Sequence, residues 1–165
     1  MIKMKIKLLT TIVVCVIAFA ACNQTKPADP EVQVITDIKK TEKMNNLISI
    51  VEIPVADFPR AVKFYQTILG VTIQEVEMDG VQLGVLPNDE GTVNVVLAKG
   101  TDYKPSADGA LLYLNAGEDL QPTLDKVGQN GGQIILPKTP ISPEMGFFAL
   151  FIDSEGNKMG LHSMK

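Results

Sequence analysis

The feature that most constrains the fold of this 165-residue chain is an internal repeat with an offset of 62 residues. At that offset, two aspartates suited to begin a helix coincide, as do three apolar helix positions and two glycines suited to end one. The matched pairs are Asp57 with Asp119, Phe58 with Leu120, Val62 with Leu124, Tyr65 with Val127, and Gly70 with Gly132. The pattern indicates a duplicated structural unit. Because a unit of about 60 residues buries little core alone, the two units are expected to pack together.

The first unit begins with a predicted strand at 48–55, where β-branched residues are frequent. Asp57 then precedes apolar residues at helical spacing, and the predicted helix ends at Gly70. Three strands follow, with Asp79-Gly80 as the hairpin turn between the first two. They are predicted at 71–78, 81–86 and 92–98.

The second unit repeats this order, with a helix from Asp119 to Gly131-Gly132. Its strands are predicted at 111–115, 133–137, 147–152 and 157–163. Each unit is therefore βαβββ, and the predicted fold class is α+β. Two such units are expected to bury one layer of helices while their paired, curved sheets enclose a cleft.

The N-terminal segment has the composition of an export signal. Lys3, Lys5 and Lys7 precede an apolar run that is too short to span a membrane, and Ala20-Ala21-Cys22 follows it. This ending resembles the lipobox of bacterial lipoproteins, in which the cysteine is acylated; an ordinary secretory signal is the alternative. The predicted organisation is a signal peptide at 1–21, a polar tether at 22–44 and a folded domain at 45–165.

Cysteine content and charge exclude several classes of function. The two cysteines are Cys15, inside the predicted signal, and Cys22, so the folded domain has no thiol for catalysis or disulfides. Removal of residues 1–21 changes the net charge from −4 to −7, which argues against nucleic acid as a partner. We expect a bacterial envelope protein anchored through lipidated Cys22. The absence of an acidic residue at Asn23-Gln24 favours the outer membrane or periplasmic face over the inner membrane.

Three segments together resemble a known family. Glu52-Ile53-Pro54-Val55-Ala56-Asp57, followed by Arg60-Ala61 and Phe64-Tyr65, is similar to the first motif of the vicinal oxygen chelate superfamily. Residues 129–132 and 153–161 resemble its second helix terminus and its final hairpin. The resemblance covers about 45–165 and implies the glyoxalase-like fold. Members include glyoxalase lyases, extradiol dioxygenases and antibiotic-binding proteins, so it fixes no single activity.

The resemblance also implies where metal ligands are expected, on the first and fourth strands of each unit. In this sequence those positions fall on Ile50, among Asn94, Val96 and Ala98, on Leu112 (with Ala110 as the alternative), and on Gly160. None is a histidine, aspartate or glutamate, although zinc, nickel and iron sites need imidazole or carboxylate donors. The sequence therefore predicts a member without the family metal site and without a cofactor.

Strand alternation predicts which side chains face the cleft. On the first strand, Val51, Ile53 and Val55 are expected under the helix. Glu52 then faces the cleft as a candidate general base, with a pKa raised by burial. Alternatively, Glu52 pairs with Lys158 or another lysine, His162 is an exposed residue near the chain end, and Tyr113 belongs to the core. The predicted pocket comprises Ile50, Glu52, Gln82, Asn94, Val96, Leu112, Lys158, Gly160 and His162.

Three functions remain open from the sequence. The first is metal-free binding of a small, partly apolar ligand in the cleft. The second is a glyoxalase-type lyase or dioxygenase-like enzyme that uses a non-standard site. The third is a structural or interaction role in the envelope. Members of the superfamily are commonly dimers, and this sequence leaves monomer and homodimer open. The resemblance also implies a flap over the pocket at the proline-containing loop 138–146, for which a rigid connector is the alternative.

Overall fold

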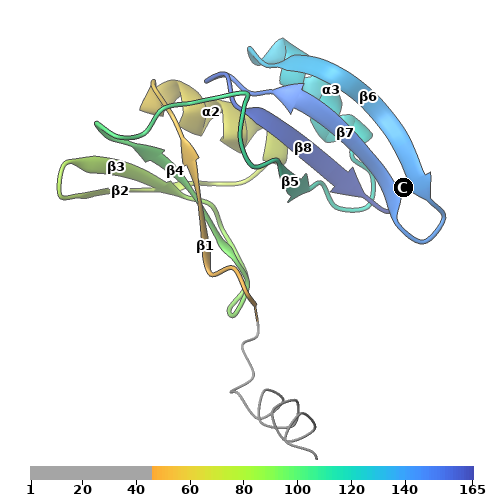
Figure 1. Ribbon diagram of the computed structural model, residues 1–165, viewed down its shortest axis with the longest axis horizontal. Coiled ribbons are helices and arrows are strands. Elements are labelled where there is room, and N and C mark those ends of the chain that lie inside the picture. The colour runs from red at the N-terminus through yellow and green to blue at the C-terminus, as the bar shows by residue number, and fades with distance from the viewer. Residues whose placement is uncertain (1–45) are drawn as a thin grey trace, which may run out of the picture. The chain divides into compact units, whose positions relative to one another are not determined.

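Both predicted repeats form βαβββ units in the computed structural model, which describes residues 46–165 (Figure 1). The predicted signal peptide, Cys22 and the tether lie outside the described residues. The first unit comprises β1 (Ile50–Pro54), α2 (Phe58–Leu69), β2 (Gln74–Met78), β3 (Val81–Val85) and β4 (Asn94–Lys99). The second comprises β5 (Leu112–Asn115), α3 (Gln121–Gln129), β6 (Gln133–Ser142), β7 (Gly146–Ile152) and β8 (Lys158–Ser163). Within 46–165, no helix has the length and apolar character needed to cross a membrane.

The two units build two separate four-stranded sheets with the same topology. The strand orders are β1-β4-β3-β2 and β5-β8-β7-β6. In each sheet the first strand pairs in parallel with the last, and the remaining pairs are antiparallel. This arrangement confirms the α+β class. It also leaves β1 and β5 as edge strands, each with one side unpaired.

Helix α2 has the ends that the sequence predicts. The Asp57 side chain accepts a hydrogen bond from the Arg60 backbone N–H at 3.2 Å, and Pro59 occupies the first turn, where its missing N–H costs nothing. Gly70 ends the helix with φ of 69°, a left-handed conformation that suits glycine. The face between these ends is buried, and it comprises Phe58, Ala61, Val62, Phe64, Tyr65 and Ile68.

The second helix is shorter and lies beside the first (Figure 1). Leu124 and Val127 form its buried face, as predicted. Gly132, just after the helix, permits close packing between the units, since a Cβ there would lie 2.7 Å from Val127 Cγ1 and 3.2 Å from Phe64 Cε2. Phe64 of α2 also meets Phe151 of β7, with ring centroids 6.3 Å apart. The two units therefore share one core beneath both helices.

The prediction of a loop at 138–146 is wrong, because most of this segment belongs to a strand. Neither a flap nor a separate connector is present there. Strand β6 continues through Pro137 and Pro140 to Ser142 and pairs with β7 despite three register shifts. Proline cannot donate to a strand ladder, so it is tolerated on edge strands and at irregularities. Because β6 is an edge strand with β7 as its one neighbour, its prolines remove no hydrogen bond to a second strand.

Candidate functional site

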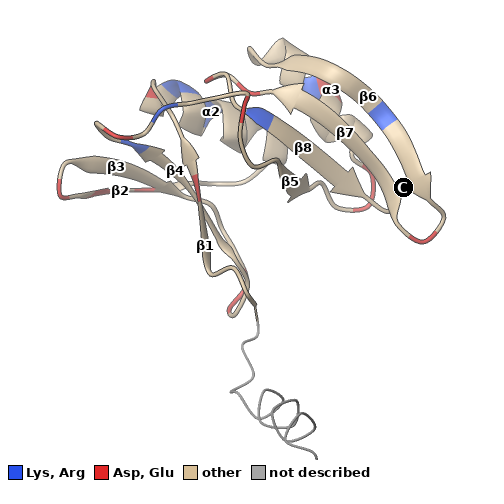
Figure 2. Ribbon diagram, in the orientation of Figure 1, with Lys and Arg blue, Asp and Glu red and all other residues tan. Residues whose placement is uncertain are grey.

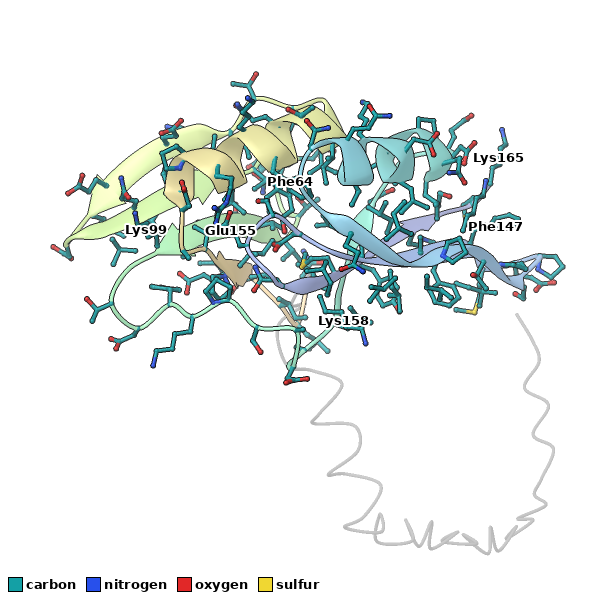
Figure 3. The ribbon with its side chains drawn as sticks, turned by 90° about the horizontal axis from the view of Figure 1, so that it is seen from above. Phe64, Lys99, Phe147, Glu155, Lys158 and Lys165 are labelled. Atoms are coloured by element: carbon teal, nitrogen blue, oxygen red, sulfur yellow. The ribbon has the colours of Figure 1, made fainter. Side chains whose placement is uncertain are left out.

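A cavity of about 440 Å³ lies at the junction between the two units. One wall is the edge strand β1, another is the segment 104–112 that connects the units, and the third is the start of β8. Lys158, on this third wall, lies on the side of the molecule away from the helices (Figure 3). The lining residues are Ile48, Val51, Glu52, Ile53, Pro54, Lys104, Ser106, Asp108, Gly109, Ala110, Leu111, Leu112, Asn157, Lys158 and Met159.

Residues 101–111, which we call the strap, cross this junction and are held by hydrogen bonds at two points. The Tyr103 hydroxyl donates a hydrogen bond to Glu52 Oε2 at 2.9 Å, and this bond raises the pKa of Tyr103 above its usual value of 10.0. The Ser106 backbone N–H donates to Asn157 Oδ1 at 3.0 Å. These contacts connect the strap to β1 of the first unit and to the β7–β8 turn of the second.

A buried polar cluster fixes one end of the cavity. Asn157 Nδ2 donates to the Pro54 carbonyl and to Asp153 Oδ2, both at 2.9 Å. Tyr65 in α2 donates its hydroxyl proton to the same Asp153 oxygen at 2.7 Å. Burial, reinforced by the Asp153 charge and this hydrogen bond, raises the pKa of Tyr65 well above 10.0. The β7–β8 turn, the end of β1 and α2 are thus held in fixed relative positions.

Glu155 in the same turn reaches the start of α2 (Figure 3). Its Oε2 accepts from the backbone N–H groups of Ala56 and Asp57 at 3.1 and 2.8 Å, while Arg60 binds both carboxylate oxygens. Burial raises the pKa of Glu155, but the hydrogen bonds from Arg60, Asp57 and Ser154 outweigh that effect, and the pKa is lowered overall from 4.5.

Three of the nine predicted pocket residues line this junction cavity: Glu52, Leu112 and Lys158. Glu52 is exposed, so the predicted burial of this side chain is wrong. Its partner is Tyr103, and no ion pair joins it to Lys158 or any other lysine among the described residues. Leu112 also packs partly against the core.

Four predicted pocket residues lie elsewhere on the first sheet. Ile50 is 59% exposed and pairs with Asn94, whose Oδ1 accepts from Asn88 Nδ2 at 3.0 Å; Val96, two residues on, is buried. None of these three is among the residues that line the junction cavity. Gln82 lies on the helix side of the sheet, where it borders a shallow depression beside Phe58. Side chains two residues apart in a strand lie on the same face of the sheet. Gly84, two residues after Gln82 in β3, lies on the helix side, since a Cβ added there would be 3.5 Å from Phe58 Cε2.

The second sheet holds the last two, Gly160 and His162. His162 Nε2 lies 2.7 Å from the Met145 carbonyl oxygen, to which the tautomer with its hydrogen on Nε2 donates. The side chain is half-buried within β8, so the interpretation of an exposed residue at the chain end is wrong. It lines a separate apolar cavity of about 480 Å³ together with Tyr113, Ile141, Met145 and Phe148.

The predicted orientation of β5 is also wrong. Tyr113 was expected in the core but is 43% exposed, and its ring lies against Gly160, where an added Cβ would sit 2.6 Å from Tyr113 Cε1. Leu114 is buried instead, and Leu112 packs partly against the core. The connection from strand to helix is longer in the second unit, so the offset of 62 residues holds for the helices but not for β5.

The residues at the expected metal positions do not fit a metal ion. Ile50, Val96 and Leu112 carry hydrocarbon side chains and Gly160 carries none. In the part of the chain that the structure describes, no group of three or more His, Cys, Asp and Glu side chains is placed to hold a metal. Transition metals in proteins need several such donors.

Sequence reasoning missed the strap, including Tyr103, Lys104, Ser106 and Asp108. These residues lie between the two repeats, so the duplication that revealed the units carried no information about them. Asn157 lies within residues 153–161, which resemble the final hairpin of the family, and no role in a site was predicted for it. The structure gives positive φ in that turn to Gly156 alone, while Asn157 serves as a buried hydrogen-bonding residue.

The chain is similar to known proteins along most of its described length. The model of the Glyoxalase/Bleomycin resistance protein/Dioxygenase superfamily matches residues 47–161. A glyoxylase-like domain-containing protein from Didymella fabae is 31% identical over 119 residues, which are 69% of this chain and 91% of that protein.

Solved structures share the fold. UcmS2 is 25% identical with a TM-score of 0.54, and the match covers 71% of this chain and 97% of that one. Glyoxalase I from Zea mays is 19% identical with a TM-score of 0.53, and 70% of this chain covers only 45% of the maize protein. TnmS3, an antibiotic binding protein from Streptomyces sp. CB03234, is 19% identical with a TM-score of 0.50, over 72% of this chain and 95% of that one.

Proposed function

Because the chain belongs to the glyoxalase/bleomycin resistance protein/dioxygenase superfamily, we propose that it binds a small, partly apolar molecule in the junction cavity without a protein-bound metal ion. The observation that carries the proposal is the composition of the cavity wall. Apolar side chains such as Ile53, Leu112 and Met159 lie beside a few polar and charged groups, including Glu52 and Lys158. Small-molecule sites combine apolar area for affinity with a few polar groups for orientation.

Two further observations support binding at this place. The volume of about 440 Å³ falls within the range of about 300–1,000 Å³ that is usual for ligand sites. The polar cluster of Tyr65, Asp153 and Asn157 holds the surrounding elements in place, so the wall is largely preformed. TnmS3 is described as an antibiotic binding protein. As part of the proposal, we infer that this chain also binds a small molecule, but we do not assign it the ligand of TnmS3.

The proposed binding site is tested with indole, a neutral apolar probe, added to the isotopically labelled full chain. Indole is expected to shift the NMR amide signals of the lining residues in a saturable manner. Gly109→Phe should abolish these shifts, since Gly109 lines the cavity and a Cβ there meets no atom within 4 Å. Gly128→Phe is the matched control, because Gly128 is equally unobstructed but lies on the exposed side of α3. Absent shifts, or equal loss in both variants, would reject the site.

The metal-free part of the proposal has an independent test. Elemental analysis of the purified protein is expected to find nickel, zinc and iron far below one atom per chain, and added metal should leave the melting temperature unchanged. The donor chemistry described above supports this expectation. A stoichiometric metal would instead favour the alternative function, a lyase or dioxygenase-like enzyme with a non-standard site.

We also propose that Cys22 carries a lipid that anchors the domain in the bacterial envelope. The support is the sequence Ala20-Ala21-Cys22 after an apolar run with a basic start. In a bacterial host, labelled palmitate should enter the wild-type chain but not Cys22→Ser. Label in both, or in neither, would contradict the anchor.

A second copy of this chain is proposed to cover the sheet faces that point away from the helices. Ile50, Val76 and Met78 are exposed on the first sheet, and Tyr113 and Met145 on the second. The first face carries Glu52 and the second carries His162, so a twofold axis that pairs unlike faces brings these two polar side chains to the same interface. Sedimentation should show a dimer, and Met78→Glu should weaken it; a monomer at all concentrations would reject the proposal.

A further inference from the structure

The open edge of β1 offers unpaired backbone groups to the junction cavity. In the parallel ladder with β4, Asn94 N–H donates to the Ser49 carbonyl and Val55 N–H to the Ala98 carbonyl. Odd-numbered residues of β1 therefore direct their backbone groups toward β4. Even-numbered residues direct theirs to the opposite edge, where the Pro54 carbonyl accepts from Asn157 Nδ2. Glu52, which lines the cavity, thus presents both its N–H and its C=O on this edge.

No other strand occupies that edge among residues 46–165. Strand β5 belongs to the other sheet, and none of the described backbone-to-backbone hydrogen bonds connects β1 to the second unit. An unpaired strand edge can accept an extended peptide as an additional strand, and main-chain hydrogen bonds then hold the peptide.

The same cavity carries charges of both signs. Lys104 and Lys158 provide two cationic groups, and Glu52 and Asp108 provide two anionic groups. Among the described residues, none of the four forms an ion pair with another. Figure 2 shows charged positions on β1, on β8 and along the segment that connects β4 to β5. Between the charged groups lie apolar side chains, Ile48, Ile53, Leu112 and Met159.

We propose that the cavity binds a short apolar peptide with free ends, added as a strand to the open edge of β1. The Glu52 backbone N–H and C=O pair with the peptide backbone. The terminal carboxylate meets Lys104 or Lys158, the terminal ammonium meets Glu52 or Asp108, and the side chains of the peptide pack on the apolar wall. At the strand rise of about 3.3 Å per residue, a tripeptide spans about 10 Å and is shorter than the five residues of β1. This inference rests on the proposed function and specifies its ligand class.

The test compares three tripeptides by calorimetry and by NMR shifts of the lining residues of the full chain. Leu-Val-Leu with free ends is expected to bind. The same peptide capped by acetyl and amide groups should bind about tenfold more weakly, because the ion pairs are lost. A free-ended peptide with an N-methylated central amide should also lose about fivefold or more, since it lacks a strand donor. Equal affinity for the free-ended and capped peptides would overturn the recognition of the termini, and an undiminished N-methyl peptide would overturn strand addition.

Variants of the protein distinguish the cavity from other surfaces. Lys158→Met and Glu52→Gln should each weaken the free-ended peptide about fivefold or more while leaving the capped peptide unchanged. Lys126→Met, at an exposed lysine of α3, is the matched control and should have no effect. Indole binding by every variant shows that each remains folded. Indole binding without peptide binding would overturn the inference and leave the proposed function standing, whereas loss of both in the wild-type chain would overturn both.

Discussion

Arg60 and Glu155 form a two-point ion pair across the boundary between the duplicated units, with Nε to Oε1 at 2.8 Å and Nη2 to Oε2 at 3.0 Å. Arg60 lies in the first turn of α2, and Glu155 lies in the turn between β7 and β8. The Glu155 side chain has no exposed surface, although that of Arg60 is 53% exposed. The carboxylate also accepts two backbone N–H groups of the first unit. It is therefore the main polar connection between the start of α2 and the second unit.

Replacement of this carboxylate should destabilise the fold. Glu155→Gln places an amide donor among groups that all donate, and we expect the free energy of unfolding to fall by about 2–4 kcal/mol. Glu118→Gln is the matched control, because Glu118 is 87% exposed and pairs only with Lys165; its effect should stay below about 1 kcal/mol. Urea denaturation measures both. Similar values for the two variants would show that the connection contributes little.

The same group predicts an acid dependence of stability. The pKa of Glu155 is lower in the folded protein than its ordinary value of 4.5, so its contribution is present above pH 4.5 and is lost as the pH falls through the folded pKa. Stability measured in urea from about pH 6 to about pH 3 should therefore fall more steeply for wild type than for Glu155→Gln. Parallel curves would contradict this assignment. Asp119, whose pKa is lowered by Lys138, contributes equally to both proteins.

The hydroxyl of Tyr65 should contribute separately. Tyr65→Phe leaves Asp153 Oδ2 with Asn157 Nδ2 as its remaining donor, and we expect a loss of about 1–3 kcal/mol in the free energy of unfolding. Tyr113→Phe removes a hydroxyl that has no hydrogen-bond partner among the described residues and should change stability by less than about 0.5 kcal/mol. Thermal and urea denaturation would measure both variants. An equally small effect of Tyr65→Phe would mean that the buried cluster does not depend on this bond.

Gly160 and Tyr113 should be energetically coupled. Gly160→Ala inserts a methyl group where the Tyr113 ring lies, and we expect it to cost about 1–3 kcal/mol. In the background of Tyr113→Ala the same substitution should cost at least about 1 kcal/mol less, as a double-mutant cycle would show. Gly128→Ala, on an exposed helical surface, should instead stabilise by up to about 1 kcal/mol. Additive effects at positions 113 and 160 would contradict the contact.

Much of the fold followed from local patterns. The bounds of α2 were predictable because Asp57 and Gly70 act on their own turns of the chain, and the Asp79-Gly80 hairpin was predictable because both residues adopt the positive φ that such a turn requires. The duplication supplied the βαβββ order of both units. The resemblance to the superfamily, read from the motifs around Glu52, Asn130 and Gly156, is confirmed by the family match.

The errors share a different origin. Buried Leu114 of β5 lies 61 residues after buried Ile53 of β1, whereas the predicted offset is 62. This odd difference of one residue reverses the two faces of β5, because strand side chains alternate with a period of two. Tyr113 therefore faces away from the core and Leu114 faces into it. The continuation of β6 through residues 138–142 was missed because its prolines argue against a central strand, and only the sheet order shows that β6 is an edge strand.

By itself, the sequence determined the repeat, the element order, the ends of α2 and the residue types available for chemistry, since these depend on neighbours along the chain or on composition. Tertiary structure alone decided that Glu52 meets Tyr103, that Glu155 binds the start of α2, and that only three predicted pocket residues share the junction cavity. Such contacts join residues 51 to 98 positions apart. They depend on how two units pack and where the strap crosses them, which no local periodicity encodes.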